Sequence, residues 1–243
     1  MTSQLDTFSI PAHIHGYPDL AFGGYVAGVL AGRSGNLTTR VDFRRVVAVD
    51  SPLRLTLPEN GRTALTTMDG TPLVEATPSM LTRFAPPAPT WAEAEAVTRF
   101  ATNNPKRAVT DCYGCGSACP PGRGLRLFPW GLRDRDMMAA TWTPDAGLAD
   151  STGQLPPEVV WSALDCPGGI TAFHFMRMGL GAFTAALTAT QFEPMFAGVD
   201  YISHAWPVQQ EGRKYTVGVA LSTRDGSLCA LAEALWIEPR PSL

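Results

Sequence analysis

The spacing of hydrophobic residues predicts a helix near the start of the chain and strands after it. Between Gly24 and Ala31, tyrosine, valine and leucine fall at mixed helical spacing, so a helix is expected to begin at Gly23-Gly24 and to stop near Gly32. Apolar and polar residues then alternate, as they do along strands with one buried face. These expected strands cover 37–49, 51–57, 62–68 and 71–81.

The middle of the chain predicts a connection between two halves. The stretch FAPPAPTW is too rich in proline for regular structure, and a short, mostly solvated helix is expected over 92–101. We therefore place a first half at 1–84, a connection at 85–105 and a second half at 106–243.

The second half predicts strands, a helix and strands again. Pro156 or Pro157 suits a helix start and Glu158 suits its positive end, so a helix is expected through Asp165. Pro167-Gly168-Gly169 should kink or interrupt this helix, which is expected to resume over 170–190. The expected strands cover 124–130, 137–144, 200–208, 214–223 and 228–238.

The two halves end alike. ALTTMDGTPLVEATPSML and VALSTRDGSLCALAEALWIE each predict a strand, a turn at Asp69-Gly70 or Asp225-Gly226, and a long strand, and each is followed by a proline-containing exit. A helix and an earlier strand precede both hairpins. Because a sheet with one buried face must cover it, we expect an α+β fold in which each helix lies on an antiparallel sheet and the two sheets join.

Composition excludes several classes of protein. Hydrophobic residues make up 45% of the chain and charged residues 17%, which is typical of a globular protein. A net charge of −3 gives no basic footprint for nucleic acid. The sequence has no apolar run of membrane-spanning length and no secretory signal pattern, and its odd count of five cysteines favours reduced thiols in a cytoplasmic protein.

Three motifs resemble a known family. AFGGYVAGVLAG, VVWSALDCPGG and CYGCGSACPPGRGLRLFPW are similar to stretches of the thioesterase-like hot-dog superfamily in its fused double-hot-dog form, over roughly 13–238. The resemblance implies a double hot-dog fold and an acyl-CoA or acyl-carrier-protein thioester as substrate. It implies no cofactor, and it leaves a homo-oligomer open.

The same resemblance suggests one complete site. Thioester hydrolysis needs donors that stabilise the oxyanion, which a helix N-terminus supplies, and a carboxylate that acts as base or nucleophile. The first half has Gly23-Gly24 at its helix start but Ala31 where the family often has an acid. The second half has Asp165 but no Gly-Gly. We expect Asp165 as base or nucleophile and the Gly24 N–H as oxyanion donor.

Further candidates surround this pair. His15 is a candidate for polarising the carbonyl or positioning water, and the expected substrate-binding residues are Gly23, Tyr25, Trp161, Arg44 and Arg45. Thr188, Thr190 and Gln191 are similar in type to the polar partners of the catalytic aspartate in some relatives. His174 and His204 are expected to be structural.

Three readings of the function stay open. A thioesterase would use Asp165 with Gly24, a hydratase or dehydratase would use His15 with Asp165, and a non-catalytic protein would only bind acyl thioesters. No metal site is expected at Cys112, Cys115 and Cys119, because zinc usually takes four ligands and no second cysteine pair follows.

Overall fold

The computed structural model describes residues 6–56, 59–104 and 109–240. The predicted boundary at 105–106 lies outside these ranges. The helices are α1 (Gly23–Ser34), α2 (Trp91–Asn103) and α3 (Pro157–Phe175), with a single 3-10 turn at Ala146–Leu148. The strands are β1 (Asp6–Phe8), β2 (His15–Tyr17), β3 (Leu20–Ala21), β4 (Thr38–Phe43), β5 (Leu53–Leu55), β6 (Thr63–Thr67), β7 (Pro72–Pro78), β8 (Trp130–Gly131), β9 (Met138–Trp142), β10 (Phe183–Gln191), β11 (Tyr201–Glu211), β12 (Lys214–Thr223) and β13 (Leu228–Ile237).

One antiparallel sheet of eleven strands runs through the described part of the molecule, in the order β1-β5-β6-β7-β4-β10-β13-β12-β11-β9-β8. The order repeats about the β4–β10 junction. In each half the strand that follows the central helix (β4 or β10) lies at the junction, and a strand from before the helix (β1 or β9) lies at or next to the outer edge. Three later strands lie between them. The sheet is therefore two similar halves joined edge to edge, as the sequence predicted.

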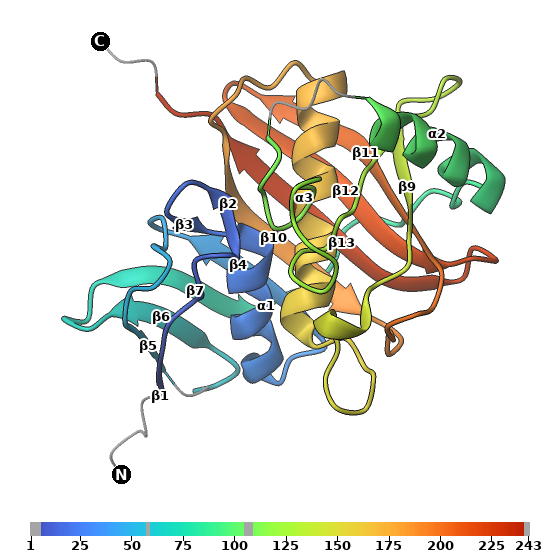
Figure 1. Cartoon of the computed structure of the whole chain (residues 1–243). Helices are drawn as coiled ribbons and strands as arrows, with labels where there is room; N and C mark the ends of the chain where they lie inside the picture. Colours follow the sequence, from blue (N-terminus) through green and yellow to red (C-terminus); the bar gives the residue numbers. More distant parts are fainter. Residues whose placement is uncertain (1–5, 57–58, 105–108, 241–243) are drawn as a thin grey trace.

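The two central helices lie side by side on one face of this sheet (Figure 1). α1 covers β4, β6 and β7, and α3 covers β11, β12 and β13. α2 packs against β8 and β9, at the edge of the sheet opposite β1, where Ala94 joins a small apolar cluster with Ala139 and Ile202. Ala140 on the same strand belongs to the main core instead, so α2 covers the opposite face of the sheet. None of the helices in the described ranges is both long and apolar enough to cross a membrane.

Glycines set the close approach of the two central helices. A Cβ atom at Gly24 would lie 2.6 Å from Ser162 Cα, and one at Gly28 would lie 2.3 Å from Glu158 Cα. Later residues of α1 thus meet earlier residues of α3, so the helices are antiparallel. The N-terminus of α1 lies directly against the middle of α3, so no residue larger than glycine fits at these two positions.

The predicted interruption of the second helix was wrong. α3 continues through Pro167 to Phe175. A Cβ atom at Gly168 would lie 2.8 Å from Val217 Cγ2, and one at Gly169 would lie 2.8 Å from ring atoms of Trp236. The two glycines let the helix pack on β12 and β13, and this packing offsets the roughly 3 kcal/mol that an internal proline costs.

Two other predicted elements were also wrong. The helix predicted over 170–190 ends at Phe175, and 183–191 form β10, which hydrogen-bonds to both β4 and β13. Alanine and β-branched threonine suit a strand between two neighbours. The strand predicted at 124–130 is reduced to Trp130–Gly131, because Arg126 has a positive φ of 52° that interrupts extended backbone.

The two predicted hairpin turns are confirmed, and their hydrogen bonds match. Gly70 and Gly226 have φ of 90° and 93°. In the first turn the Asp69 carboxylate accepts from the Thr67 hydroxyl and the Thr71 amide, and Asp225 accepts from Thr223 and Ser227 in the same way. Identical networks at both turns support an internal repeat, while the limits 1–84 and 106–243 stay a prediction.

Candidate active site

A buried carboxylate lies where the two helices meet. Asp165 on α3 is 1% exposed, and each of its oxygens accepts one hydrogen bond. Oδ2 accepts from the Gly24 amide of α1 at 2.8 Å, and Oδ1 accepts from the Thr184 hydroxyl of β10 at 2.8 Å. The sequence predicted that Gly24 and Asp165 come together, and the structure brings them into direct contact across the two halves.

Burial changes the acidity of this carboxyl group. Desolvation raises the pKa of Asp165 to about 7, although the bonds from Thr184 and Gly24 lower it. Negative charge at Cys112 raises the pKa of Asp165 further, by a smaller amount. A carboxyl group whose pKa lies near neutrality can accept a proton and return it.

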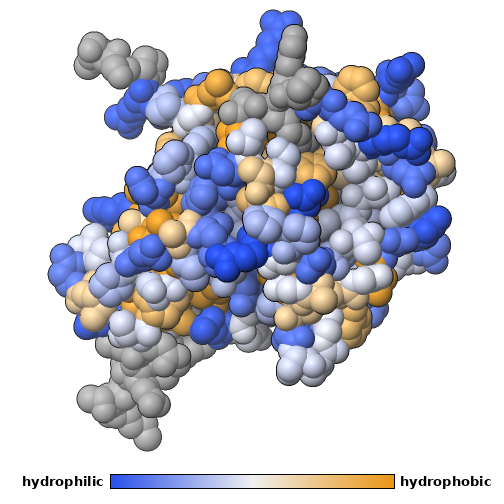
Figure 2. All heavy atoms as spheres, in the orientation of Figure 1, coloured by the Kyte–Doolittle hydropathy of each residue, from blue (hydrophilic) through white to orange (hydrophobic). Residues whose placement is uncertain are grey.

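An apolar cavity of about 340 Å³ opens beside Asp165. Both halves of the chain line it, and the apolar lining residues include Leu20, Phe22, Val26, Phe43, Phe183 and Trp236. The polar groups that reach it are Tyr17, Gly23, Thr184 and Asp165, together with Arg44 and Arg45. On the molecular surface hydrophobic residues form separate patches, one of them beside β2 and β3 (Figure 2). An apolar space with a few convergent polar groups is typical of a small-molecule site.

The start of α1 offers backbone donors to this cavity. The Gly24 N–H, which was expected to face an oxyanion, donates to Asp165 instead. The N–H groups of Gly23 and Tyr25 have no hydrogen-bond partner among the described residues. Gly23 also lines the cavity, and it stands at the start of α1, which is the positive end of the helix dipole.

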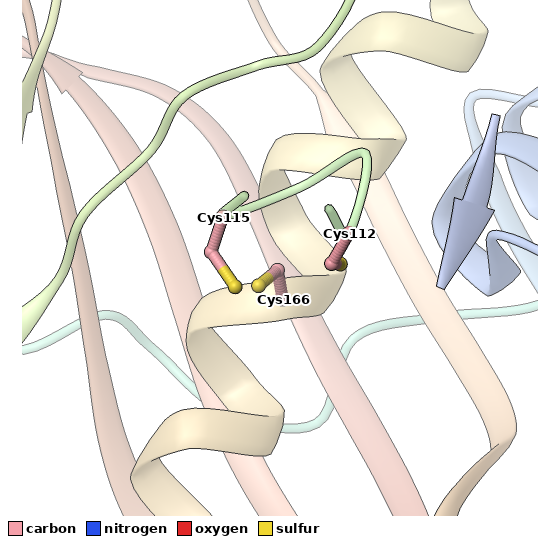
Figure 3. A group of neighbouring side chains, drawn as sticks. All are labelled: Cys112, Cys115 and Cys166. Carbon is pink, nitrogen blue, oxygen red and sulfur yellow. The ribbon is translucent and has the colours of Figure 1, made fainter. Parts of the chain in front are cut away.

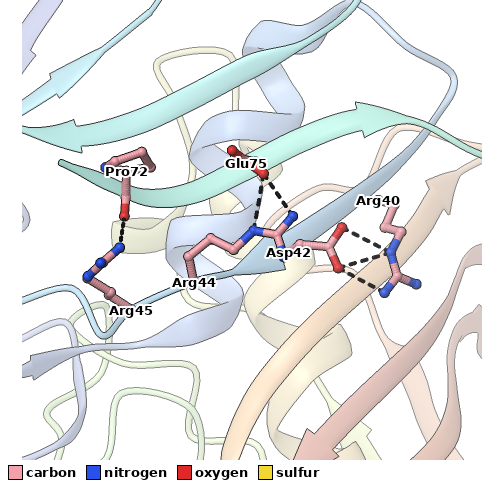
Figure 4. Close-up of polar contacts among 6 residues, drawn as sticks. All are labelled: Arg40, Asp42, Arg44, Arg45, Pro72 and Glu75. Carbon is pink, nitrogen blue, oxygen red and sulfur yellow. Dashed lines mark hydrogen bonds and ion pairs between the residues drawn. The ribbon is translucent and has the colours of Figure 1, made fainter. Parts of the chain in front are cut away.

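Arg44 and Arg45, which were predicted to bind substrate, line the cavity. Arg44 forms an ion pair of 3.0 Å with Glu75, and Arg45 donates to the Pro72 carbonyl at 3.0 Å (Figure 4). Arg45 has no acidic partner in the part of the chain that the structure describes. Its charge is therefore available to an anionic group at the cavity.

Three other predicted site residues lie away from the cavity. The His15 ring lies 2.8 Å from the Ala12 carbonyl at Nδ1 and 3.4 Å from the Asp111 carboxylate at Nε2. Tyr25 follows Gly24, and the helical turn directs its ring onto Tyr113, 5.9 Å away between centroids. Trp161 is buried in the core. None of the three lines the cavity.

The sequence missed Thr184. It pointed to Thr188, Thr190 and Gln191, but Thr190 bonds to Thr38 and Gln191 bonds to the Glu193 carbonyl. A helix was predicted here, so the strand that carries this threonine was not recognised. The pairing of β10 with β13 also shifts register between 184 and 186, which breaks simple alternation.

Two predicted structural histidines pack against aromatic rings. His204 is 1% exposed, stacks on Trp206 and lies 3.4 Å from the Pro86 carbonyl. Burial lowers its pKa to about 4. His174 lies against Trp130 and Phe175. Neither lines the cavity.

The equivalent place in the other half lacks these groups. α3 begins with Pro157, which has no N–H, and it lies against the end of α1 near Gly32. Ala31 occupies the position that corresponds to Asp165. The two halves therefore share a scaffold, and the carboxylate and the glycine start meet at one of the two places.

Comparisons with known proteins give the fold. No family model and no curated protein matches the sequence. Among solved structures, the tesB protein of Mycobacterium avium subs. paratuberculosis is similar with a TM-score of 0.65 at 12% identity, over 97% of this chain and 93% of that chain. A protein provisionally named thioesterase II from Thermobifida fusca gives 0.64 at 15% identity, over 97% and 94%.

A third structure is named for the fold itself. A conserved protein from Alicyclobacillus acidocaldarius with a hot-dog fold gives a TM-score of 0.63 at 12% identity, over 100% of this chain and 96% of that chain. At such identities the likeness establishes the architecture and not the chemistry. The chain has the α+β hot-dog fold in its doubled form.

Proposed function

We propose that the protein hydrolyses an acyl thioester in the cavity between its halves, with Asp165 as the catalytic carboxylate. The observation that carries this proposal is the buried Asp165, held between the start of α1 and Thr184 and open to an apolar cavity. One of the similar structures, that from Thermobifida fusca, carries a thioesterase name, which supports the same chemistry.

The arrangement favours Asp165 as a general base. Each of its oxygens accepts one hydrogen bond and keeps a lone pair that can take a proton from water, and its pKa of about 7 suits a base at neutral pH. As a base, Asp165 takes a proton from water while the water oxygen bonds to the thioester carbonyl carbon. The Gly23 N–H stabilises the resulting oxyanion. Collapse of the intermediate breaks the carbon–sulfur bond, and Asp165 returns the proton to the leaving thiolate.

The cavity lining suits an acyl chain on a phosphate-bearing thiol. Phe43, Phe183 and Trp236 supply apolar surface for the acyl group. Arg44 and Arg45 would meet phosphate at the entrance, and both coenzyme A and the prosthetic group of acyl-carrier proteins carry one. The choice of carrier and a cytoplasmic location remain predictions.

Release of free thiol from a panel of acyl-CoA thioesters of increasing chain length tests the proposal. We expect Asp165→Asn to lower kcat/KM by about 10²–10⁴-fold, the usual contribution of a general base. Thr184→Val should lower it by about tenfold or more, since a hydrogen bond to a charged group is lost. Thr188→Val is the control, because Thr188 is buried on the same strand and does not line the cavity.

Unchanged turnover in a folded Asp165→Asn variant would overturn the assignment. Tight binding of acyl-CoA by the wild-type chain without turnover would instead show a binding protein. The hydratase reading needs His15 beside Asp165, and the observed partners of His15 do not support it.

A further inference from the structure

Three cysteines from two distant parts of the sequence meet at α3, the helix that carries Asp165. Cys112 and Cys115 lie on the loop that crosses α3, and Cys166 lies on α3 itself (Figure 3). Their three sulfur atoms all lie within 4.8 Å of one another. Cys112 and Cys166 are buried and Cys115 is half-buried, and all three are thiols.

The sequence pointed to a different third cysteine. Cys119 was grouped with Cys112 and Cys115, but its Sγ lies 3.4 Å from the carbonyls of Asp111 and Cys112 and does not belong to the group of sulfur atoms within 4.8 Å of one another. The third sulfur comes from Cys166, 51 residues after Cys115 and adjacent to Asp165. The structure therefore gives a different set of three cysteines, whose sulfur atoms do meet.

Backbone geometry holds the loop against α3. A Cβ atom at Gly114 would lie 2.8 Å from Cys166 Cβ, and one at Gly116 would lie 2.5 Å from the Cys112 carbonyl. The loop is fixed by hydrogen bonds from the Gly116 amide to the Cys112 carbonyl at 2.7 Å and from the Tyr113 amide to the His15 carbonyl at 2.8 Å. Glycine is thus required where the loop touches the helix, and the contact presents the sulfurs to each other.

Three sulfur atoms this close together form a ligand set for a metal ion. Cysteine binds metal ions as thiolate, so binding releases the thiol protons.

We propose that Cys112, Cys115 and Cys166 bind one Zn²⁺ ion, with a non-protein ligand in the fourth position. Zinc lies about 2.3 Å from thiolate sulfur, so three sulfurs of a tetrahedral site are about 3.8 Å apart. The observed separations need to shrink by at most about 1 Å to reach this geometry. Three protein ligands with one open position are a common zinc arrangement.

Charge and ligand number select zinc among thiophilic metals. Iron–sulfur clusters generally take four cysteines, and the cluster has three. Three thiolates leave a net charge of −1 around Zn²⁺ but −2 around Cu⁺, which is harder to accommodate in a buried place beside Asp165. Hard cations prefer oxygen ligands, which the cluster does not offer.

Metal binding by the full chain tests this proposal without any substrate, so the result is independent of the thioesterase assignment. The protein is purified under reducing conditions without chelator, its zinc content is measured by mass spectrometry, and the metal-free form is titrated with Cd²⁺. We expect one zinc per chain, a thiolate-to-cadmium charge-transfer band that saturates at one equivalent, and a higher Tm with zinc.

Variants locate the site. Cys166→Ser and Cys115→Ser should each lose the band and the zinc-dependent rise in Tm, and Cys115 is half-buried, so its replacement disturbs the core least. Cys119→Ser in the same loop is the matched control and should bind like the wild type. Absence of zinc binding, binding of Cu⁺ alone, full binding by the Cys115→Ser variant, or a Cys112–Cys115 disulfide in the native protein would each overturn the proposal.

Discussion

Asp165 receives one hydrogen bond from each half, and these two bonds oppose the effect of its burial. Since desolvation raises its pKa to about 7, the basic form is scarce in acid and predominates above neutrality. We expect kcat/KM to rise about tenfold per pH unit below pH 7 and to level off above it, after correction for uncatalysed hydrolysis. A pH–rate profile of the wild-type chain measures this directly.

Thr184→Val supplies the internal check on that profile. Its hydroxyl lowers the pKa of Asp165, so its removal should move the rising limb to higher pH. A midpoint that is the same in the Thr184→Val variant and the wild type would show that another group limits the rate.

At the residue scale, the sequence predicted the contact between Gly24 and Asp165 but not the other residues that meet around them. Gly24 and Asp165 were predicted to meet because the family resemblance implies a paired site, to which each half brings what the other lacks. Thr184 reaches Asp165 because β10 lies at the junction of the two half-sheets. Cys166 meets Cys112 and Cys115 because their loop crosses α3. Both arrangements depend on tertiary packing. His15 lies shortly before the start of α1, as the sequence indicated. The orientation of its ring follows from the Ala12 carbonyl and the Asp111 carboxylate, which no motif indicates.

At the element scale, the glycine face of α1 decides how closely the helices pack. We expect Gly28→Ala to destabilise the protein by about 1–3 kcal/mol, because the new Cβ would overlap the backbone of Glu158. The gain in helix propensity, about 1 kcal/mol, offsets only part of this. Urea denaturation of the variant and the wild type measures the difference.

Gly32→Ala is the matched control on the same helix. Its Cβ would lie 3.0 Å from the Pro157 ring and not against backbone, so the loss should be smaller. Equal stability of Gly28→Ala and the wild type would contradict the close packing of α1 on α3.

Local patterns predicted α1 and the two hairpins because these elements depend on nearby residues. The same reasoning failed for α3 at Pro167 and for β10. In α3 the sheet compensates a proline that would end an isolated helix, and in β10 two neighbouring strands impose an extended form on an alanine-rich run. Both errors arise where long-range contacts outweigh local preference.

At the scale of the whole molecule, the chain contains two similar halves but one place with a complete set of groups. We expect a non-hydrolysable thioester analogue to bind with a stoichiometry of one per chain, since Ala31 and Pro157 replace the carboxylate and the free helix start at the other place. Isothermal titration calorimetry measures this number. Two equal sites per chain would contradict the asymmetry between the halves.

The β4–β10 junction, which makes one sheet from two halves, also bears on how such a protein can evolve. In a dimer of identical chains every substitution appears twice, so a change that harms one site harms its twin. Here Ala31 and Asp165 are encoded separately, and so are Gly24 and Glu158. One half can therefore accept a proline at its helix start for stability while the other retains its glycines for chemistry, and natural selection acts on each copy alone.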